Sequence, residues 1–137
     1  MMEKNSARQR SHEKLSRALI VEDSGIFRTL LKETLHGRFP SMEIDEAADG
    51  QEARQKILSN MPGLIFMDIK LPGENGLDLT AKIKAEHPDI IIFILTSYDT
   101  PEYREAAAQA KANYFLSKGS SSKESILALV ESALSRQ

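Results

Sequence analysis

Four short apolar runs in the sequence each lead into residues that could take part in phosphate or metal chemistry. ALIV is followed by Glu22 and Asp23, LIFM by Asp68, IIIFIL by Thr96, and YFL by a serine and then Lys118. Three carboxylates brought close together repel strongly, and one of them would stay protonated unless a cation lay between them. The candidate ligands are hard oxygens with no His or Cys among them, which favours Mg²⁺ over zinc.

A carboxylate, a hard cation, an ammonium group and a hydroxyl are together what phosphoryl transfer needs. Catalysis of that reaction consists mostly of positioning the reactants and neutralising oxygen charge. A carboxylate can act as the nucleophile and become an acyl phosphate. Asp68 is therefore the candidate nucleophile, with Thr96 and Lys118 as candidate contacts of the transferred group. Each residue alone is weak evidence, because acidic turns, capping hydroxyls and surface lysines are common; their joint occurrence at successive strand ends predicts a phosphorylation site.

Alternating apolar and amphipathic segments supply the elements that must position these residues. Strands are predicted at 18–21, 42–48, 64–67, 90–95 and 114–116, each followed by apolar residues at helical spacing. In the first helical segment the residues at this spacing are Phe27, Leu30, Leu31 and Leu35. Five strand–helix units in succession predict an α/β fold, a doubly wound five-stranded parallel sheet with helices on both faces.

The order of the strands and the place of the site follow from the same pattern. Right-handed crossovers leave few topologies, of which the flavodoxin-like order 2-1-3-4-5 is common at this size. The second run, MEIDEAA, alternates in polarity and is predicted to be an edge strand. Ligands of such sheets bind outside the carboxyl ends of the strands, so the four chemical positions are expected to share one pocket there.

Bulk properties agree with one domain that buries its own core. The chain has 137 residues, 41% of them apolar, and the lack of Cys excludes disulfides and thiolate metal sites. No run is long enough to span a bilayer and no signal-peptide pattern opens the chain, so we expect a cytoplasmic protein. A net charge of −2 gives no indication of nucleic-acid binding. We expect residues 1–17 to be a flexible basic tail, with a docking arm for an acidic partner as the alternative, and residues 18–137 to be the domain.

Four stretches resemble the response regulator receiver domains of two-component signalling, in the order that the family has them. ALIVEDSGIFRTLL resembles the first strand and acidic-pair turn, and LIFMDIKLPGENGLDL resembles the phosphoacceptor segment. ILTS resembles the fourth-strand switch segment and NYFLSKG the fifth-strand lysine segment. The resemblance covers residue 18 to the C-terminus and is closest to stand-alone, chemotaxis-regulator-like receivers.

This resemblance implies a role for each matching residue. Asp68 would accept a phosphoryl group from a histidine of a sensor histidine kinase or histidine phosphotransfer protein. Mg²⁺ would be held by Glu22, Asp23, Asp68 and the backbone carbonyl of Lys70. Lys118 would pair with an oxygen of the attached phosphoryl group.

A switch between two states is implied as well. Thr96 would bond the phosphoryl group and move inward, which opens space into which Phe115 could turn. The face built by the fourth helix, fifth strand and fifth helix would then change shape; a plain core role for Phe115 is the alternative. Tyr114 is expected to lie outward or partly buried. The resemblance is incomplete at Gly119, where many family members have a proline after a cis bond, and nothing favours a cis bond here.

Two further expectations concern access to the site. Lys70 and Tyr98 stand two residues after Asp68 and Thr96, at positions that flank the approach of water, so their bulk is expected to lengthen the lifetime of the phosphoryl group. Ile26 would face the helix bundle of the phosphodonor on the family pattern, with ordinary core packing as the alternative.

The sequence therefore predicts a stand-alone signalling switch and no enzyme beyond its own phosphorylation and dephosphorylation. Its output would be a downstream protein, with no direct nucleic-acid contact and no membrane insertion, and a homodimer on phosphorylation stays open. The alternative is a receiver excised from a DNA-binding transcription regulator. An aspartyl-phosphate phosphatase is disfavoured because Lys70 stands where such enzymes have a second acid. An FMN binder is disfavoured because Glu22 and Asp23 would repel the phosphate of FMN. A degenerate receiver, which would only bind partners, is disfavoured because every position expected to take part in phosphoryl chemistry carries a suitable residue.

Overall fold

Five parallel strands form the centre of the structure, a computed structural model that describes residues 16–135. They are β1 (Arg17–Val21), β2 (Glu43–Ala47), β3 (Leu64–Met67), β6 (Ile91–Thr96) and β7 (Tyr114–Ser117). Their order, β2-β1-β3-β6-β7, is the predicted 2-1-3-4-5 when the strands of this sheet are counted along the chain. β2 lies at an edge, as its alternating polarity predicted, and is only partly buried.

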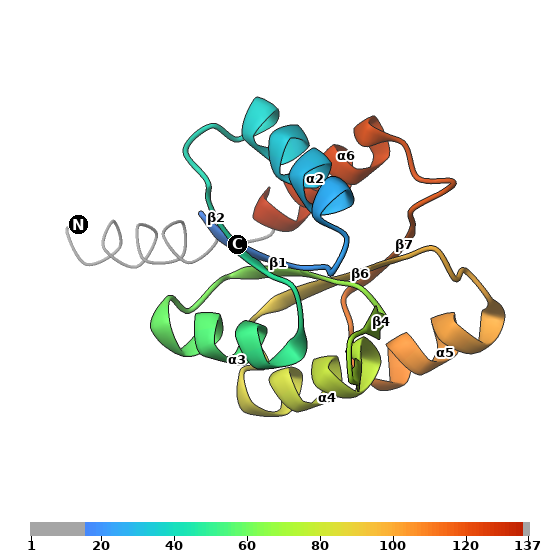
Figure 1. Cartoon of the computed structure of the whole chain (residues 1–137). Helices are drawn as coiled ribbons and strands as arrows, with labels where there is room; N and C mark the ends of the chain where they lie inside the picture. Colours follow the sequence, from blue (N-terminus) through green and yellow to red (C-terminus); the bar gives the residue numbers. More distant parts are fainter. Residues whose placement is uncertain (1–15, 136–137) are drawn as a thin grey trace.

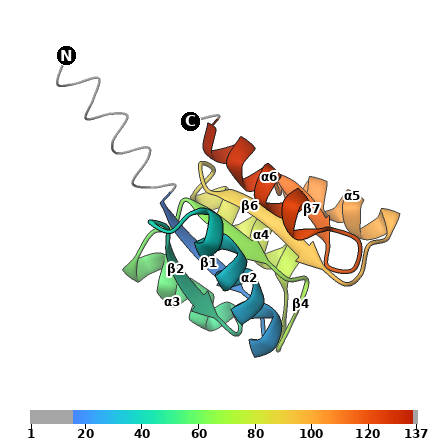
Figure 2. The same cartoon turned by 90° about the horizontal axis from the view of Figure 1, so that it is seen from above.

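Helices cover both faces of this sheet (Figures 1 and 2). They are α2 (Gly25–Arg38) and α6 (Lys123–Ser135) on one face, and α3 (Gly50–Ser59), α4 (Gly76–Glu86) and α5 (Pro101–Gln109) on the other. The side chains of Ser24, Asp49, Asn75 and Thr100 cap the first turns of α2, α3, α4 and α5 by accepting backbone hydrogen bonds. Ser24 directly follows the acidic pair, so this cap also fixes the turn between β1 and α2.

Two apolar layers lie between the sheet and its helices. Every residue of β3 and β6 is buried, because successive side chains enter opposite layers. This arrangement is why both strands read as continuous apolar runs. The rings of Phe66, Phe93 and Tyr114 stack across β3, β6 and β7, with centroids 4.8 and 4.7 Å apart. Tyr114 is partly buried, as predicted.

A small antiparallel pair that the sequence did not predict follows β3. It consists of β4 (Lys70–Leu71) and β5 (Glu74–Asn75), and Gly73 makes the turn between them with φ 71°. Arg54 of α3 donates two hydrogen bonds to the Glu74 carboxylate, of 3.0 and 2.5 Å. The pair is thereby held against α3, beside the end of β3.

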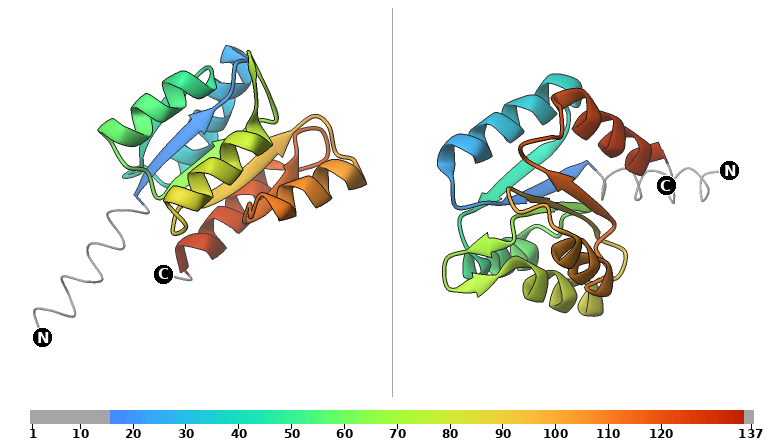
Figure 3. Two further views of the ribbon diagram at one scale, coloured as in Figure 1. Left: turned by 90° about the horizontal axis from the view of Figure 1, so that it is seen from below. Right: turned by 90° about the vertical axis from the view of Figure 1, so that its right-hand side faces the viewer.

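The parallel strands all point the same way, so their carboxyl ends form one edge of the sheet (Figure 3). Arg17, expected in the tail, is the first residue of β1 and pairs with Glu43 at 2.8 Å. Most of the predicted tail, residues 1–15, lies outside the described residues. Within 16–135 no helix has the length and apolar character needed to cross a membrane.

Candidate functional site

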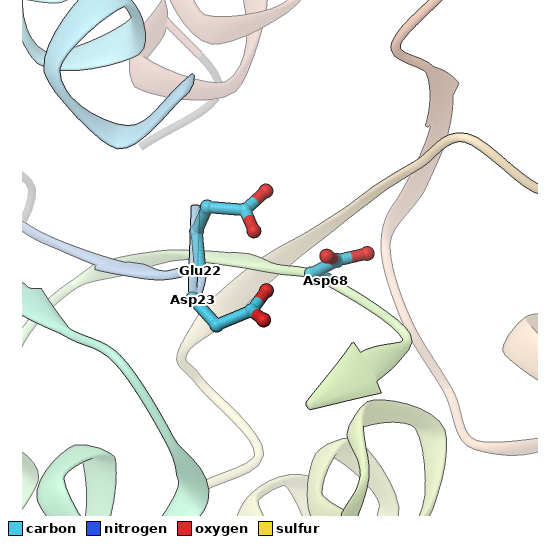
Figure 4. Close-up of side chains that lie close together, drawn as sticks. All are labelled: Glu22, Asp23 and Asp68. Carbon is cyan, nitrogen blue, oxygen red and sulfur yellow. The ribbon is translucent and has the colours of Figure 1, made fainter. Parts of the chain in front are cut away.

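Three carboxylates meet where β1 and β3 end side by side (Figure 4). Glu22 and Asp23 follow β1, Asp68 follows β3, and one oxygen of each lies within 4.8 Å of the others. Glu22 and Asp68 are buried whereas Asp23 is exposed, so the cluster is open on one side. Burial raises the pKa of Glu22 even though Lys118 and the Ser24 amide donate hydrogen bonds to its carboxylate.

A close approach of the backbone at Gly76 shapes the chain around Asp68. The Gly76 amide donates to the Ile69 carbonyl at 2.7 Å, and a Cβ on Gly76 would lie 1.8 Å from the Asp68 carbonyl oxygen. Only glycine fits such an approach. The Ile69 amide in turn donates to Oδ1 of Asp68 at 2.8 Å. The Asp68 side chain is thus oriented by its own backbone, and its other oxygen is left for Lys118.

Lys118 follows β7 and brings its ammonium to the same carboxylates. Its Nζ donates to Oε1 of Glu22 in a short contact and to Oδ2 of Asp68 at 3.3 Å. The side chain is 15% exposed, and the Phe27 ring centroid lies 4.4 Å from Nζ. The described residues contain no cis peptide bond, so the bond between Lys118 and Gly119 is trans, as predicted.

The two residues predicted to form the switch lie on neighbouring strands, β6 and β7. Thr96 is fully buried, and its Oγ1 accepts a hydrogen bond from the Tyr98 amide at 3.1 Å. Phe115 is partly buried against the apolar layer beneath α3, α4 and α5, and the Arg104 guanidinium lies 4.8 Å from its ring centroid. Asp99 holds this guanidinium with two hydrogen bonds, of 2.6 and 2.9 Å. The switch role of both residues stays a prediction.

Lys70 and Tyr98, predicted to flank the site, also contact each other. The Lys70 Nζ lies 5.0 Å from the Tyr98 ring centroid, within cation–π range. A hollow of about 400 Å³ lies beside the cluster, with Asp23, Lys70 and Tyr103 in its lining. The open side of the carboxylate cluster therefore has room for a hydrated ion or a phosphoryl group.

Two apolar residues of α2 are exposed to solvent near this edge. Ile26 is 79% exposed and Leu30, one turn later on the same face, is 56% exposed. Core packing, the alternative for Ile26, is therefore wrong. Leu30 fell at the spacing of the buried Leu31 and Leu35 but is not in the core; it lines a groove of about 360 Å³ together with residues of α6.

Comparison with known proteins supplies the family. Residues 18–131 match the model of the response regulator receiver domain. The chain belongs to this family of receiver domains. Oxygen regulatory protein NreC of Staphylococcus epidermidis is 35% identical over 112 residues, which are 81% of this chain and 51% of NreC. A cyclic di-GMP phosphodiesterase of Thermotoga maritima is 33% identical over 100 residues, 73% of this chain and 26% of that protein. This receiver thus spans about half the length of NreC.

Solved receiver structures agree with the fold. A CheY-like response regulator receiver domain protein from Methanospirillum hungatei is 27% identical with a TM-score of 0.79, covering 88% of this chain and 94% of that one. A LuxR-family two-component response regulator from Aurantimonas is 28% identical with a TM-score of 0.79, covering 88% and 86%. Receivers are phosphoacceptor switches that work with a histidine kinase or phosphotransfer protein and bind Mg²⁺ in an acidic pocket. The hard-oxygen cluster of this receiver fits such an ion.

Proposed function

We propose that this receiver takes a phosphoryl group onto Asp68 from a histidine of a sensor kinase or phosphotransfer protein and thereby switches a protein-binding face. The surroundings of Asp68 carry the proposal. The residue is buried beside two further carboxylates. One of its carboxylate oxygens accepts a hydrogen bond from a backbone amide, and the other accepts one from the ammonium of Lys118. A purely structural acid at a strand end would not require two neighbouring carboxylates together with an ammonium group.

Transfer forms a bond between an Asp68 carboxylate oxygen and phosphorus, and the bond between phosphorus and the histidine nitrogen breaks. The electron pair of that bond stays on the nitrogen, and the ring leaves as neutral imidazole because its other nitrogen carries the proton. Lys118, already 3.3 Å from Oδ2, would neutralise one phosphoryl oxygen. Thr96 accepts from the Tyr98 amide but keeps its own hydroxyl hydrogen, so it could donate to a second phosphoryl oxygen.

Glu22, Asp23, Asp68 and the Lys70 carbonyl would hold Mg²⁺. When bound, the ion supplies positive charge against the crowded carboxylate and phosphoryl oxygens. The raised pKa of Glu22 reflects burial first, with the nearby Asp68 adding to it, so a cation here would relieve an existing repulsion.

The exposed Ile26 and Leu30 support a docking face for the phosphodonor on α2, as the family pattern suggests for Ile26. The output would be a protein that recognises the face around α5, β7 and α6, in the cytoplasm, without turnover of an external substrate. The alternative is that this receiver works with a DNA-binding output domain. Two observations support this alternative: the receiver spans only about half the length of NreC, and it is similar to a LuxR-family two-component response regulator.

The test is incubation with Mg²⁺ and acetyl phosphate followed by measurement of the intact mass. The wild type should gain one phosphoryl group, and Asp68→Asn should gain none. Asp78→Asn, which changes an acid of α4 outside the cluster, is the matched control and should behave as the wild type. Equal labelling of the wild type and Asp68→Asn would overturn the proposal.

A further inference from the structure

The side chain of Phe27, in the first turn of α2, lies against the ammonium of Lys118. The distance of 4.4 Å from Nζ to the ring centroid is inside the roughly 6 Å range of a cation–π contact. The ring is partly buried and the lysine side chain is 15% exposed. Cation–π contacts are stronger where water is excluded, so we expect the Phe27 ring to attract the Lys118 ammonium more strongly than it would in an exposed pair.

Lys118 needs restraint beyond its hydrogen bonds. An ammonium has three donors, and here Glu22 and Asp68 accept from it. Glu22 is also a candidate metal ligand, and turning toward a cation would loosen its hold on Lys118. The backbone of Lys118 is held to β6, because its amide donates to the Thr96 carbonyl at 2.8 Å, so the part that can move is the flexible four-carbon side chain.

Space for the ammonium to leave the site is present as well. Lys118 and Phe27 both line the groove of about 360 Å³ between α2 and α6. A flexible four-carbon side chain beside such a groove could turn into it, away from Asp68. The Phe27 ring contacts the ammonium at this same boundary between groove and site.

We propose that Phe27 is a positioning residue for Lys118. Its ring face keeps the ammonium within reach of Asp68 before transfer and of the phosphoryl oxygen afterwards. The role requires an aromatic face, and apolar bulk alone does not fulfil it. The inference rests on the proposed phosphorylation of Asp68 and adds to it a residue of α2 that sets the rate of phosphoryl uptake.

The experiment measures the rate of phosphoryl uptake from acetyl phosphate, which removes docking of a protein donor from the comparison. Phe27→Leu keeps apolar packing and should slow uptake roughly 3- to 30-fold, the range that corresponds to losing a partly desolvated cation–π contact. Phe27→Trp keeps a ring face and should stay within about twofold of the wild type. Phe39→Leu, another partly buried aromatic packed on the same layer, is the matched control and should leave the rate unchanged.

A double-mutant cycle separates positioning from general packing. In a Lys118→Ala background, Phe27→Leu should change the rate less than twofold, because the ring has no ammonium left to hold. Equal slowing by Phe27→Leu in both backgrounds would overturn the inference, as would normal uptake by Phe27→Leu alone. If Phe27→Leu does not fold, Phe27→Met takes its place in the cycle with the same expectation. Absence of uptake by the wild type would refute the proposed function and this inference together. Uptake by the wild type with either of the two contrary results above would refute this inference alone.

Discussion

Replacing Gly76 with alanine should damage both the fold and the phosphorylation of Asp68. The new Cβ would lie 1.8 Å from the Asp68 carbonyl oxygen, 2.9 Å from its carbonyl carbon and 3.1 Å from the Ile69 Cα. These are backbone atoms, so no side-chain rotation relieves the clash, and the two segments must separate by roughly 1.6 Å to reach ordinary contact. The separation would also stretch the 2.7 Å hydrogen bond from the Gly76 amide to the Ile69 carbonyl.

The steric clash and the stretched hydrogen bond together set the expected loss of stability. Overpacking costs about 1–3 kcal/mol and a buried backbone hydrogen bond about 1 kcal/mol, so the free energy of unfolding should fall by about 2–4 kcal/mol. Uptake should fall as well, by tenfold or more, because displacing a reacting group by about 1 Å costs up to 10²-fold in rate. Urea unfolding followed by circular dichroism measures the first quantity, and the mass gained from acetyl phosphate measures the second.

Gly37 in α2 provides the matched control. A Cβ there meets nothing within 4 Å and the residue lies in a helix, so Gly37→Ala should stabilise the protein by about 0.5–1 kcal/mol without changing uptake. The reasoning is refuted if Gly76→Ala unfolds at the same urea concentration as the wild type, or if it loses stability but Asp68 is phosphorylated at the wild-type rate.

Three further predictions follow from particular contacts. Lys70→Asn and Tyr98→Ala should each shorten the lifetime of the phosphoryl group, because each removes one side of the contact beside the site; the decay of the phosphorylated mass after donor removal measures this, and unchanged decay in both contradicts it. Ile26→Asp should slow transfer from a phosphorylated histidine protein but not from acetyl phosphate, since the exposed side chain touches only the larger donor; equal slowing with both donors argues against a docking face. Burial would raise the pKa of Glu46, but hydrogen bonds from two basic side chains of α2 outweigh burial and lower this pKa below its usual value of 4.5. The ionised Glu46 carboxylate therefore stabilises the fold above about pH 4.5, and this stabilisation is lost as the pH falls through the pKa of the folded state. Glu46→Gln should therefore be less stable than the wild type by about 0.2–1 kcal/mol at pH 7, with a difference that shrinks toward zero on acidification, and a difference independent of pH in urea unfolding would contradict this.

The fold was predictable because its signals are strong and local. Strands that are buried on both faces read as continuous apolar runs, and β3 occupies the predicted residues 64–67. The carboxyl ends of parallel strands share one edge, which is why residues as distant along the chain as Glu22 and Lys118 could be expected in one pocket. The pair β4–β5 was missed because strands of two residues have no detectable period.

What the sequence did not reveal depends on side-chain rotamers and on which face of a helix turns outward. The contact of Arg104 with Phe115 joins a helix to a strand through a long, flexible side chain, and no spacing along the chain signals it. The exposure of Leu30 was likewise hidden, since a helical apolar stripe does not say where the core ends and a surface groove begins. The lysine ammonium was expected near a phosphoryl group, whereas its pairing with Glu22 is visible only in three dimensions.

Identification of the modified residue tests the central claim most directly. An aspartyl phosphate is reduced by borohydride to homoserine, which peptide mass spectrometry can assign to one position. After treatment with Mg²⁺ and acetyl phosphate, the wild type should carry homoserine at position 68 and at no other acid of the cluster. Reduction at position 22 or 23, or a phosphoryl group that borohydride does not convert at all, would contradict the assignment of Asp68 as the phosphoacceptor.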